Sequence, residues 1–163
     1  MDKVSKAART VPIKVTVNGE PWEGEVRCEE TLLGFLRDRL GLKGTKRSCE
    51  SQVCGACTVL VDGLAVSSCS YLAWEARDKQ VQTIEGLACG GKLDPVQEAF
   101  VKHSAVQCGY CTPGMIMMVK ALLMENPHPS REEIRNWLNG SICRCGTYVA
   151  VEQAILDVAG GTE

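Results

Sequence analysis

The sequence predicts an α+β protein in which a small sheet, crossed by one helix, is followed by a bundle of four short helices. Two turn pairs, Asn18-Gly19 and Asp62-Gly63, separate alternating apolar runs in the first half and indicate β-hairpins. In the second half, capping patterns such as Ser130-Arg131-Glu132-Glu133 precede stretches with helical periodicity. The third observation is the presence of ten cysteines in a chain of 163 residues, which is far more than a soluble core requires.

The first half is expected to alternate between strands and one helix. After a loose tail at residues 1–10, the predicted strands span residues 11–17, 21–27, 58–61, 64–68 and 81–84. The helix starts at Glu30-Thr31, carries its apolar residues through Leu40, and stops at Gly41. Because a single helix accompanies this sheet, it is expected to pack across one face.

The second half is expected to be helical throughout. Three glycines within residues 86–91 mark the predicted domain boundary, so the domains are placed at 1–85 and 86–163. A capping pattern at Asp94, with Pro95 at the first helical position, opens the first helix. The four predicted helices span about residues 95–103, 112–126, 131–139 and 149–158. Helices of this length, with short connections, favour a small bundle.

The composition is that of an ordinary soluble protein, with 45% hydrophobic and 23% charged residues. A net charge of −2 and 5% aromatic residues give no indication of nucleic-acid binding. No secretory segment, twin-arginine pair or apolar run of about 18 residues is present in the sequence. We therefore expect a cytoplasmic protein without a membrane span, a setting in which clustered cysteines bind metal more often than they form disulfides.

The first cysteine set comprises Cys49, Cys54, Cys57 and Cys69. Its C-x4-C-x2-C spacing, followed by a distant fourth cysteine, is typical of plant-type [2Fe–2S] ferredoxins. Gly55 and Ala56 lie between the second and third ligands, where large side chains would crowd the metal, and a curled loop can direct backbone N–H groups toward an anionic centre. Structural zinc is the alternative, but four-cysteine zinc sites usually combine two short cysteine pairs, and Cys69 stands alone.

The second set comprises Cys108 and Cys111, just before one predicted helix, and Cys143 and Cys145, just before another. If the two helix N-termini meet, four thiolates converge where both helix dipoles favour negative charge. This arrangement suits a second iron–sulfur cluster, and zinc would fit four cysteines nearly as well. A thioredoxin-like redox pair is disfavoured because the surrounding sequence is helical and lacks a βαβ pattern.

The two sets together resemble the small iron–sulfur subunit of the molybdenum hydroxylases, the family of xanthine oxidase, aldehyde oxidoreductase and carbon monoxide dehydrogenase. The resemblance covers about residues 11–159 and is carried by CESQVCGACTV with Cys69, by QCGYCTPGM and by ICRCGTY. It implies a plant-ferredoxin-like β-grasp domain followed by a four-helix bundle. It also implies an oxidoreductase subunit that holds one [2Fe–2S] cluster on each cysteine set and has no substrate site of its own.

The resemblance further implies partners. A large subunit would carry molybdopterin beside the helical domain, and a medium subunit would carry FAD nearer the β-grasp domain, in a heterotrimer or a dimer of heterotrimers. Electrons would pass from molybdenum through both clusters to FAD. Gln107 and Cys145 match positions that approach the pterin in this family; a loop amide that is merely satisfied locally is the structural alternative for Gln107.

Two departures from the family pattern stand out. Many relatives read C-R-C-T-G-Y, whereas this chain has Gly146-Thr147 after Cys145, an order that resembles a branch including isoquinoline and some aldehyde oxidoreductases. Many relatives also carry glycines between the first two cysteines, whereas this chain has residues 50–53, Glu-Ser-Gln-Val. We expect a stiffer loop there, with an altered backbone but unchanged ligation.

Two cysteines lie outside both sets, Cys28 and Cys89, and we expect them to be small buried residues without a metal role. Single histidines at positions 103 and 128 do not provide the histidine pair that a Rieske-type centre requires. Two further hypotheses for the whole chain remain at this stage: a free two-cluster ferredoxin and a zinc-stabilised binding module.

Overall fold

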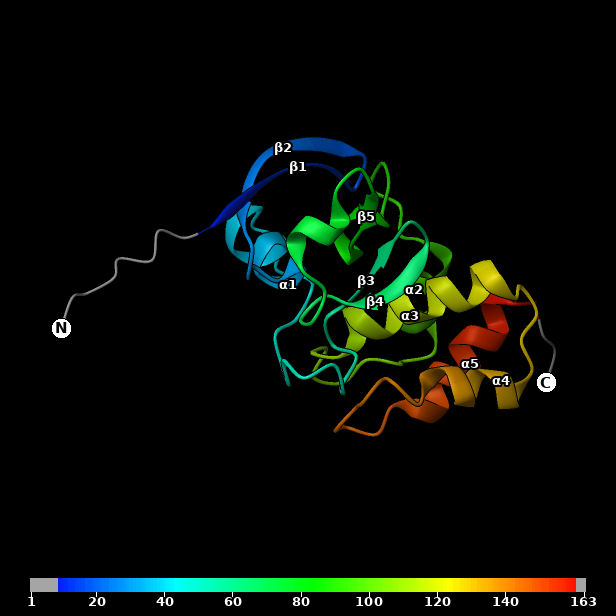
Figure 1. Ribbon diagram of the computed structural model, residues 1–163. Coiled ribbons are helices and arrows are strands. Elements are labelled where there is room, and N and C mark those ends of the chain that lie inside the picture. The colour runs from blue at the N-terminus through cyan, green and yellow to red at the C-terminus, as the bar shows by residue number, and fades with distance from the viewer. Residues whose placement is uncertain (1–8, 161–163) are drawn as a thin grey trace.

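A computed structural model describes residues 9–160 (Figure 1). The first half forms a five-stranded sheet with the strand order β2-β1-β5-β3-β4. Strands β1 and β5 pair in parallel, and the other neighbouring strands pair antiparallel. The strands are β1 (Thr10–Val17), β2 (Glu20–Arg27), β3 (Thr58–Val61), β4 (Leu64–Ser67) and β5 (Gln80–Gln82). Both hairpin turns form as expected, with left-handed backbone at Asn18 and Asp62.

The helix across the sheet consists of α1 (Leu32–Gly34), continued by a π-helical turn, η1 (Phe35–Arg39). Thr31 caps it, since its hydroxyl oxygen accepts a hydrogen bond from the Gly34 N–H at 3.1 Å. The predicted helix is thus confirmed in position, but its second part is wider than an α-helix. Phe35 and Leu36 are fully buried against the sheet, so this segment supplies the cover that the sheet needs.

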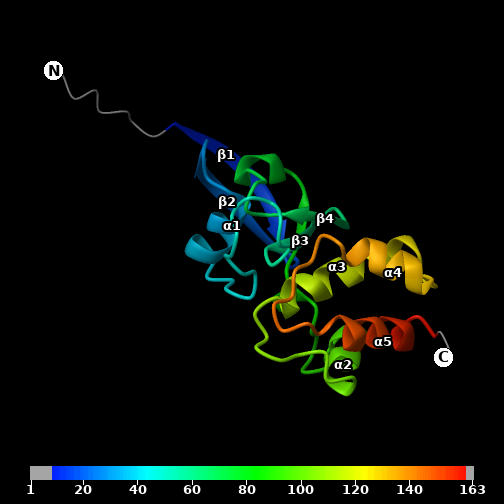
Figure 2. The same cartoon turned by 90° about the horizontal axis from the view of Figure 1, so that it is seen from below.

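The second half contains α2 (Pro95–Lys102), α3 (Thr112–Glu125), α4 (Arg131–Leu138) and α5 (Tyr148–Val158). Asp94 and Ser130 cap α2 and α4 through the predicted reciprocal capping boxes. The four helices lie together on one side of the sheet, with α3 next to β3 (Figures 1 and 2). The predicted α+β fold, a ferredoxin-like β-grasp half followed by four helices, is therefore confirmed.

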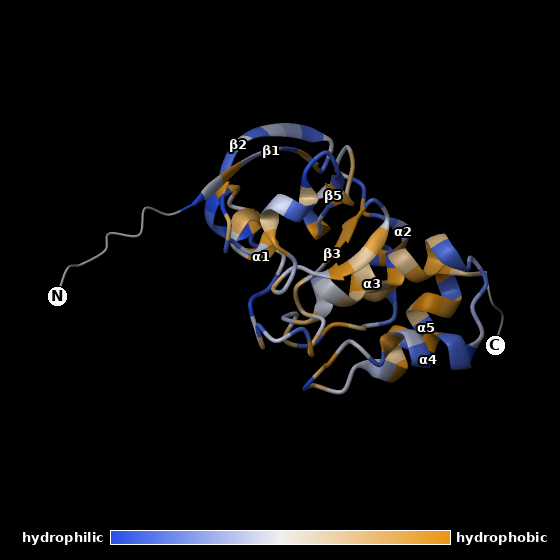
Figure 3. Ribbon diagram, viewed as in Figure 1, coloured by the Kyte–Doolittle hydropathy of each residue, from blue (hydrophilic) through white to orange (hydrophobic). Residues whose placement is uncertain are grey.

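The two halves share the strand β3, which is buried along its whole length. Val59 and Val61 pack into the core between the sheet and α1, whereas Leu60 packs into the helical core. This alternation follows from the two-residue period of a strand. Hydrophobic residues are accordingly concentrated on β3, α3 and α5, while β2 is largely hydrophilic (Figure 3). One strand thereby holds both halves in register.

Two local details differ from the sequence prediction. The last strand was expected at residues 81–84, but β5 ends at Gln82 because the chain turns through a 3-10 helix, η3 (Ile84–Gly86). The Asn18 side chain fixes this turn, accepting the Thr83 N–H at 2.8 Å and donating to the Thr83 hydroxyl at 2.9 Å. A second 3-10 helix, η2 (Ala73–Ala76), lies in the predicted connector.

Among the described residues, no helix is long and apolar enough to span a membrane.

Candidate metal centres

The first cysteine set lies around the loop between η1 and β3, and Cys69 returns to it just after β4. Cys57 and Cys69 are buried, and Leu33 of α1 packs behind both of them. Their thiols contact each other, and burial together with this neighbour raises the pKa of Cys57 to about 11. The hydroxyl of Ser68 donates to the Cys57 carbonyl at 2.7 Å. These contacts hold one pair of sulfurs in a dry site.

The exposed part of the same loop curls around Cys49. Glu50, Gln52 and Gly55 all have left-handed backbone, with φ values of 53°, 63° and 70°. The Ser51 N–H donates to the Cys49 sulfur at 3.4 Å. Hydrogen bonds from Ser51, and then from the N–H groups of residues 53 and 54, lower the pKa of Cys49 to about 6. The loop therefore favours a thiolate, as the sequence suggested, and it does so without the glycines of many relatives.

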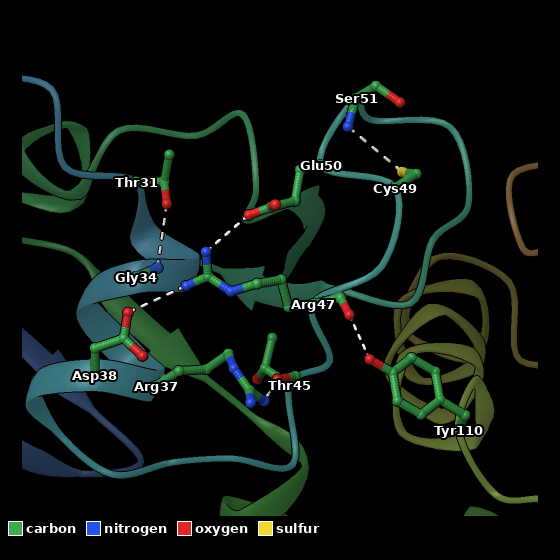
Figure 4. A network of polar contacts seen from close by, with 10 residues as sticks. All are labelled: Thr31, Gly34, Arg37, Asp38, Thr45, Arg47, Cys49, Glu50, Ser51 and Tyr110. Carbon is green, nitrogen blue, oxygen red and sulfur yellow. Dashed lines mark hydrogen bonds and ion pairs between the residues drawn. The ribbon is translucent and has the colours of Figure 1, made fainter.

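Arg47 links this loop to η1 through its side chain (Figure 4). Its guanidinium group donates to Glu50 at 2.8 Å and to Asp38 of η1 at 3.1 Å. The contact with Glu50 secures a residue whose left-handed backbone is unfavourable for a non-glycine side chain. Sequence reasoning did not identify Arg47, because a single surface charge beside a cysteine gives no signal of its partners.

The second cysteine set is assembled from two loops far apart in sequence. Cys108 and Cys111 directly precede α3, and Cys143 and Cys145 directly precede α5. The structure brings the loops together, with the thiol of Cys108 contacting that of Cys145 and the thiol of Cys111 contacting that of Cys143. Each pair thus takes one cysteine from each loop, and both helix N-termini face the set.

The two pairs differ in environment. Cys111 and Cys143 form the inner pair, since Cys111 is half-buried and Cys143 is buried, whereas Cys108 is exposed and Cys145 half-buried. Burial raises the pKa of Cys111 to about 12. Burial also acts to raise the pKa of Cys143, but hydrogen bonds from Thr147, from the Cys111 side chain and from the backbone of Cys145 together outweigh it and lower that pKa to about 7. Cys143 therefore favours the thiolate form although it is buried.

The two cysteine sets are joined directly. The Ile142 N–H, next to Cys143, donates to the carbonyl oxygen of Cys54 at 3.0 Å. The hydroxyl of Tyr110 donates to the Arg47 carbonyl (Figure 4). Figures 1 and 2 both show the three cysteine-bearing loops side by side at one end of α3. Cys54 of the first set is therefore hydrogen-bonded directly to the loop that carries Cys143 of the second set.

Glycines allow this close contact, called here the joint, between the Cys54–Gly55 loop, the start of α3 and the loop before Cys143. A Cβ on Gly114, in the first turn of α3, would lie less than 3.0 Å from the Gly55 carbonyl oxygen. A Cβ on Gly55 would likewise lie less than 3.0 Å from the Gly140 carbonyl oxygen. Backbone atoms cannot move aside as a flexible side chain can, so both positions require glycine.

The contacts among the thiols suit an iron–sulfur cluster. Thiols meet in pairs, as shown for Cys57 with Cys69 and for both pairs of the second set. Zinc requires four ligands on one ion, whereas a [2Fe–2S] cluster takes two thiolates on each of two irons. The residues present therefore fit the cluster.

The remaining candidates lie away from these pairs or at their edge. Gln107 is exposed beside Cys108, at the outer edge of the second set. The expectation of burial is wrong for Cys89, which lies exposed in the glycine-rich turn, and Cys28 is only half-buried. His103 contacts Asp157 at 3.1 Å, and His128 contacts the Ala159 carbonyl at 2.8 Å. Both histidines thus serve contacts at helix ends.

Comparison with known families assigns both halves. Residues 15–93 match the family described as 2Fe-2S iron-sulfur cluster binding domain, and residues 83–156 match the family described as [2Fe-2S] binding domain. Together the two matches span nearly the whole chain. The chain therefore has the two domain types of a protein with two iron–sulfur centres.

Individual relatives agree with this assignment. The nicotine 6-hydroxylase small subunit of Paenarthrobacter nicotinovorans is 45% identical over 150 residues, covering 92% of this chain and 90% of that protein. The xanthine dehydrogenase iron-sulfur-binding subunit of Escherichia coli O157:H7 is 45% identical over 153 residues, covering 92% and 95%. Among solved structures, quinoline 2-oxidoreductase from Pseudomonas putida 86 superposes with a TM-score of 0.88 at 43% identity, covering 93% of this chain and 94% of that chain. The chain belongs to the iron–sulfur subunits of the molybdenum hydroxylases, which are oxidoreductases.

Proposed function

We propose that this electron-transfer subunit relays electrons between two [2Fe–2S] clusters, one held by Cys49, Cys54, Cys57 and Cys69 and the other by Cys108, Cys111, Cys143 and Cys145. Each cluster would supply a centre that accepts and releases one electron at a time. The observation that carries the proposal is the 3.0 Å hydrogen bond between Ile142 and Cys54. It connects the backbone of one proposed ligand with the residue next to another.

The chain's own residues prepare both sites. The curled loop directs N–H groups at Cys49, and the N-termini of α3 and α5 favour negative charge near the second set. Burial of Cys57 and Cys143 keeps water from the inner sulfurs. Hydrogen bonding and burial are two of the means by which a protein sets the potential of such a centre.

The exposed edges of the two sets suggest where partners bind. Gln107 and Cys108 are exposed at the edge of the second set, next to the half-buried Cys145. We propose that Gln107 and Cys145 face molybdopterin in a large subunit, as the family resemblance implies. Cys49 is exposed on the first set, and we propose that this edge faces FAD in a medium subunit. Electrons would then travel from molybdenum through the second set and the first set to FAD.

Apolar side chains surround the second set on the surface. Tyr110, Ile142 and Val149 are 49%, 50% and 77% exposed. Apolar residues gathered around a redox site favour a permanent subunit interface over a transient docking face. A heterotrimer, or a dimer of heterotrimers, in the cytoplasm is the assembly that we propose. Neither a free two-cluster ferredoxin nor a zinc module is favoured by any specific contact among the described residues.

The division into domains is also part of the proposal. We place the boundary between residues 85 and 86, within η3 (Ile84–Gly86). The two family matches overlap across residues 83–93, a segment that contains this position. Each cysteine set then lies wholly within one domain.

Metal analysis and EPR spectroscopy of the anaerobically purified chain test the proposal. About four iron and four acid-labile sulfide per chain, with two distinct signals after dithionite reduction, are expected. Cys57→Ser should remove or alter one signal and Cys111→Ser the other, while Cys89→Ser, at an exposed position outside both sets, should alter neither. Zinc in place of iron, or the loss of both signals on substitution of one cysteine, would contradict the two ligand sets.

Co-purification tests the partners separately. We expect a molybdopterin-containing subunit and a flavin-containing subunit to remain bound at high salt, because an apolar interface is little weakened by ionic screening. A chain with both clusters that elutes alone at every salt concentration would instead indicate a free two-cluster ferredoxin.

A further inference from the structure

Thr147 occupies the N-cap position of α5, yet its side chain does not cap the helix. An N-cap threonine ordinarily accepts a hydrogen bond from a backbone N–H of the first helical turn. Here the hydroxyl oxygen lies 3.2 Å from the sulfur of Cys143. Both residues are only 7% exposed, so water does not compete for this contact. The Thr147 hydroxyl thus contacts the Cys143 sulfur and leaves the N-terminus of α5 without a side-chain cap.

The direction of this hydrogen bond follows from ligation. A thiol and a hydroxyl can each donate, but a cysteine that binds iron has lost its proton. Thr147 must then be the donor and the Cys143 sulfur the acceptor.

The surrounding contacts hold donor and acceptor in place. The hydroxyl of Tyr148 accepts the Cys143 N–H at 2.7 Å and donates to the Ser141 carbonyl at 3.1 Å. Gly146 has a φ of 79°, a conformation that a β-branched residue such as threonine adopts only with strain. The order Gly146-Thr147 therefore places the threonine at the position next to the Cys143 sulfur. The departure from the pattern C-R-C-T-G-Y thus puts a hydroxyl group within reach of a cysteine sulfur.

We propose that Thr147 raises the reduction potential of the second cluster by donating a side-chain hydrogen bond to the Cys143 sulfur. The inference rests on the proposed function, because it requires a cluster on the second cysteine set. Reduction adds negative charge that the ligand sulfurs share, so a donor stabilises the reduced form more than the oxidised form. Thr147 acts through Cys143 and is therefore a positioning residue with an electrostatic effect.

The two cysteine sets offer different opportunities to test this idea. The donors to Cys49 include backbone N–H groups, which a side-chain substitution does not remove. The donor to Cys143 includes a hydroxyl, which Thr147→Val removes at nearly constant shape. Since the hydroxyl makes no bond to the first turn of α5, the valine variant loses no helix cap. A change of potential can thus be separated from a change of fold.

The experiment is a redox titration of the full chain in its purified complex, followed by EPR. The signal that Cys111→Ser alters identifies the second cluster. Thr147→Val should lower the ratio of reduced to oxidised second cluster at a fixed potential by about three- to tenfold, a tenfold change corresponding to 59 mV for one electron. Thr147→Ser should restore the ratio, and the first cluster should not change in either variant.

Thr83→Val is the matched control. It removes a fully buried threonine hydroxyl whose partners are Asn18 and Glu85, outside both cysteine sets. Neither cluster's potential should shift in this variant. If Thr147→Val loads poorly with iron, comparing Thr147→Ala with Thr147→Ser isolates the same hydroxyl.

Three results would overturn the role of Thr147. They are an unchanged potential in both hydroxyl-free variants, an equal shift in both clusters, and a serine variant that behaves like the valine variant. Absence of a second signal from the unmodified protein would overturn the proposed function together with this inference. An unchanged potential with two intact signals would overturn the inference alone.

Discussion

The two cysteine sets, which we propose hold similar clusters, are built differently. In the first, one loop curls through left-handed positions and contributes three of four cysteines, with backbone N–H groups directed at an exposed sulfur. In the second, two loops more than 30 residues apart meet at the starts of α3 and α5, and a threonine hydroxyl reaches a buried sulfur. A local loop can organise itself, whereas the second site depends on the helices that carry its loops.

The two sets meet at one place, the contact between the Cys54–Gly55 loop, the start of α3 and the loop before Cys143. There the backbone of Gly55 lies between Gly140 and Gly114, and a single hydrogen bond links Cys54 with Ile142. Changes at the joint should disturb both sets, changes within the helices only the second, and changes within the curled loop only the first.

The largest effect is expected at Gly114. Gly114→Ala places a Cβ against the backbone of Gly55 and Ala56, and we expect a loss of about 2 kcal/mol in the free energy of unfolding, the range typical of overpacking. Both EPR signals should change. Gly140→Ala is the control, because a Cβ there meets nothing within 4 Å, and it should alter stability by less than about 0.5 kcal/mol. Equal effects of the two substitutions in chemical denaturation would argue against a tight joint.

A smaller effect is expected at Glu152 of α5, whose carboxylate accepts hydrogen bonds from Arg131 at 2.6 Å and Arg135 at 2.7 Å of α4. Glu152→Gln should cost about 1–2 kcal/mol at pH 7 and affect only the second signal. Lys14→Gln removes an exposed ion pair with Glu23 in the sheet and should cost less than about 0.5 kcal/mol.

The effect of Glu152 should depend on pH. Hydrogen bonds from Arg135 in the first place, and from Arg131, lower the pKa of this carboxyl in the folded protein. A lowered pKa stabilises the fold above the usual glutamate range, and that contribution disappears as the pH falls through the folded-state value. The difference in stability between the native chain and Glu152→Gln should therefore shrink as the pH falls below about 4.3. A difference that grows toward acid would contradict this assignment.

Tyr110→Phe should have a still smaller effect, because it removes one hydrogen bond to the Arg47 carbonyl from a partly exposed ring. We expect a loss of about 0.5–1 kcal/mol, measured by thermal unfolding. The first and second signals should both shift slightly, since the contact bridges the two loops. Tyr71→Phe, which removes two hydroxyl contacts within the sheet half, to the Glu75 carbonyl and from Lys79, should leave the second signal unchanged.

The smallest effect, and the only gain, is expected at Gln52. Its φ of 63° suits glycine, so Gln52→Gly should raise stability by about 0.5 kcal/mol or leave it unchanged. Ser51→Gly, at a neighbouring position without a left-handed φ, should lower stability instead. If both glycine variants lower stability equally, the curled backbone does not strain Gln52. The second signal should be unaffected in either variant.

Much of this organisation was predictable from short-range patterns. The turn pairs, capping residues and cysteine spacing depend on neighbouring residues, so both hairpins, the capped helices and the first loop were located correctly. Cys89 was wrongly expected to be buried, because burial depends on what packs against a turn and not on the residue type. Arg47 was missed for the same reason, since its partners Asp38 and Glu50 are recognisable only after η1 and the loop have folded together.

The sequence by itself determined the order of the elements, the α+β fold class and the spacing of the two cysteine sets, because each is encoded by residue type and position along the chain. Only the tertiary structure decided which thiols touch, Cys108 with Cys145 and Cys111 with Cys143. It also decided that the Cys54 carbonyl accepts the Ile142 N–H, and that the Thr147 hydroxyl contacts the Cys143 sulfur in place of capping α5. These contacts join residues from distant segments. They arise because β3 holds the sheet and the helices in one register, and because glycines let the backbones approach.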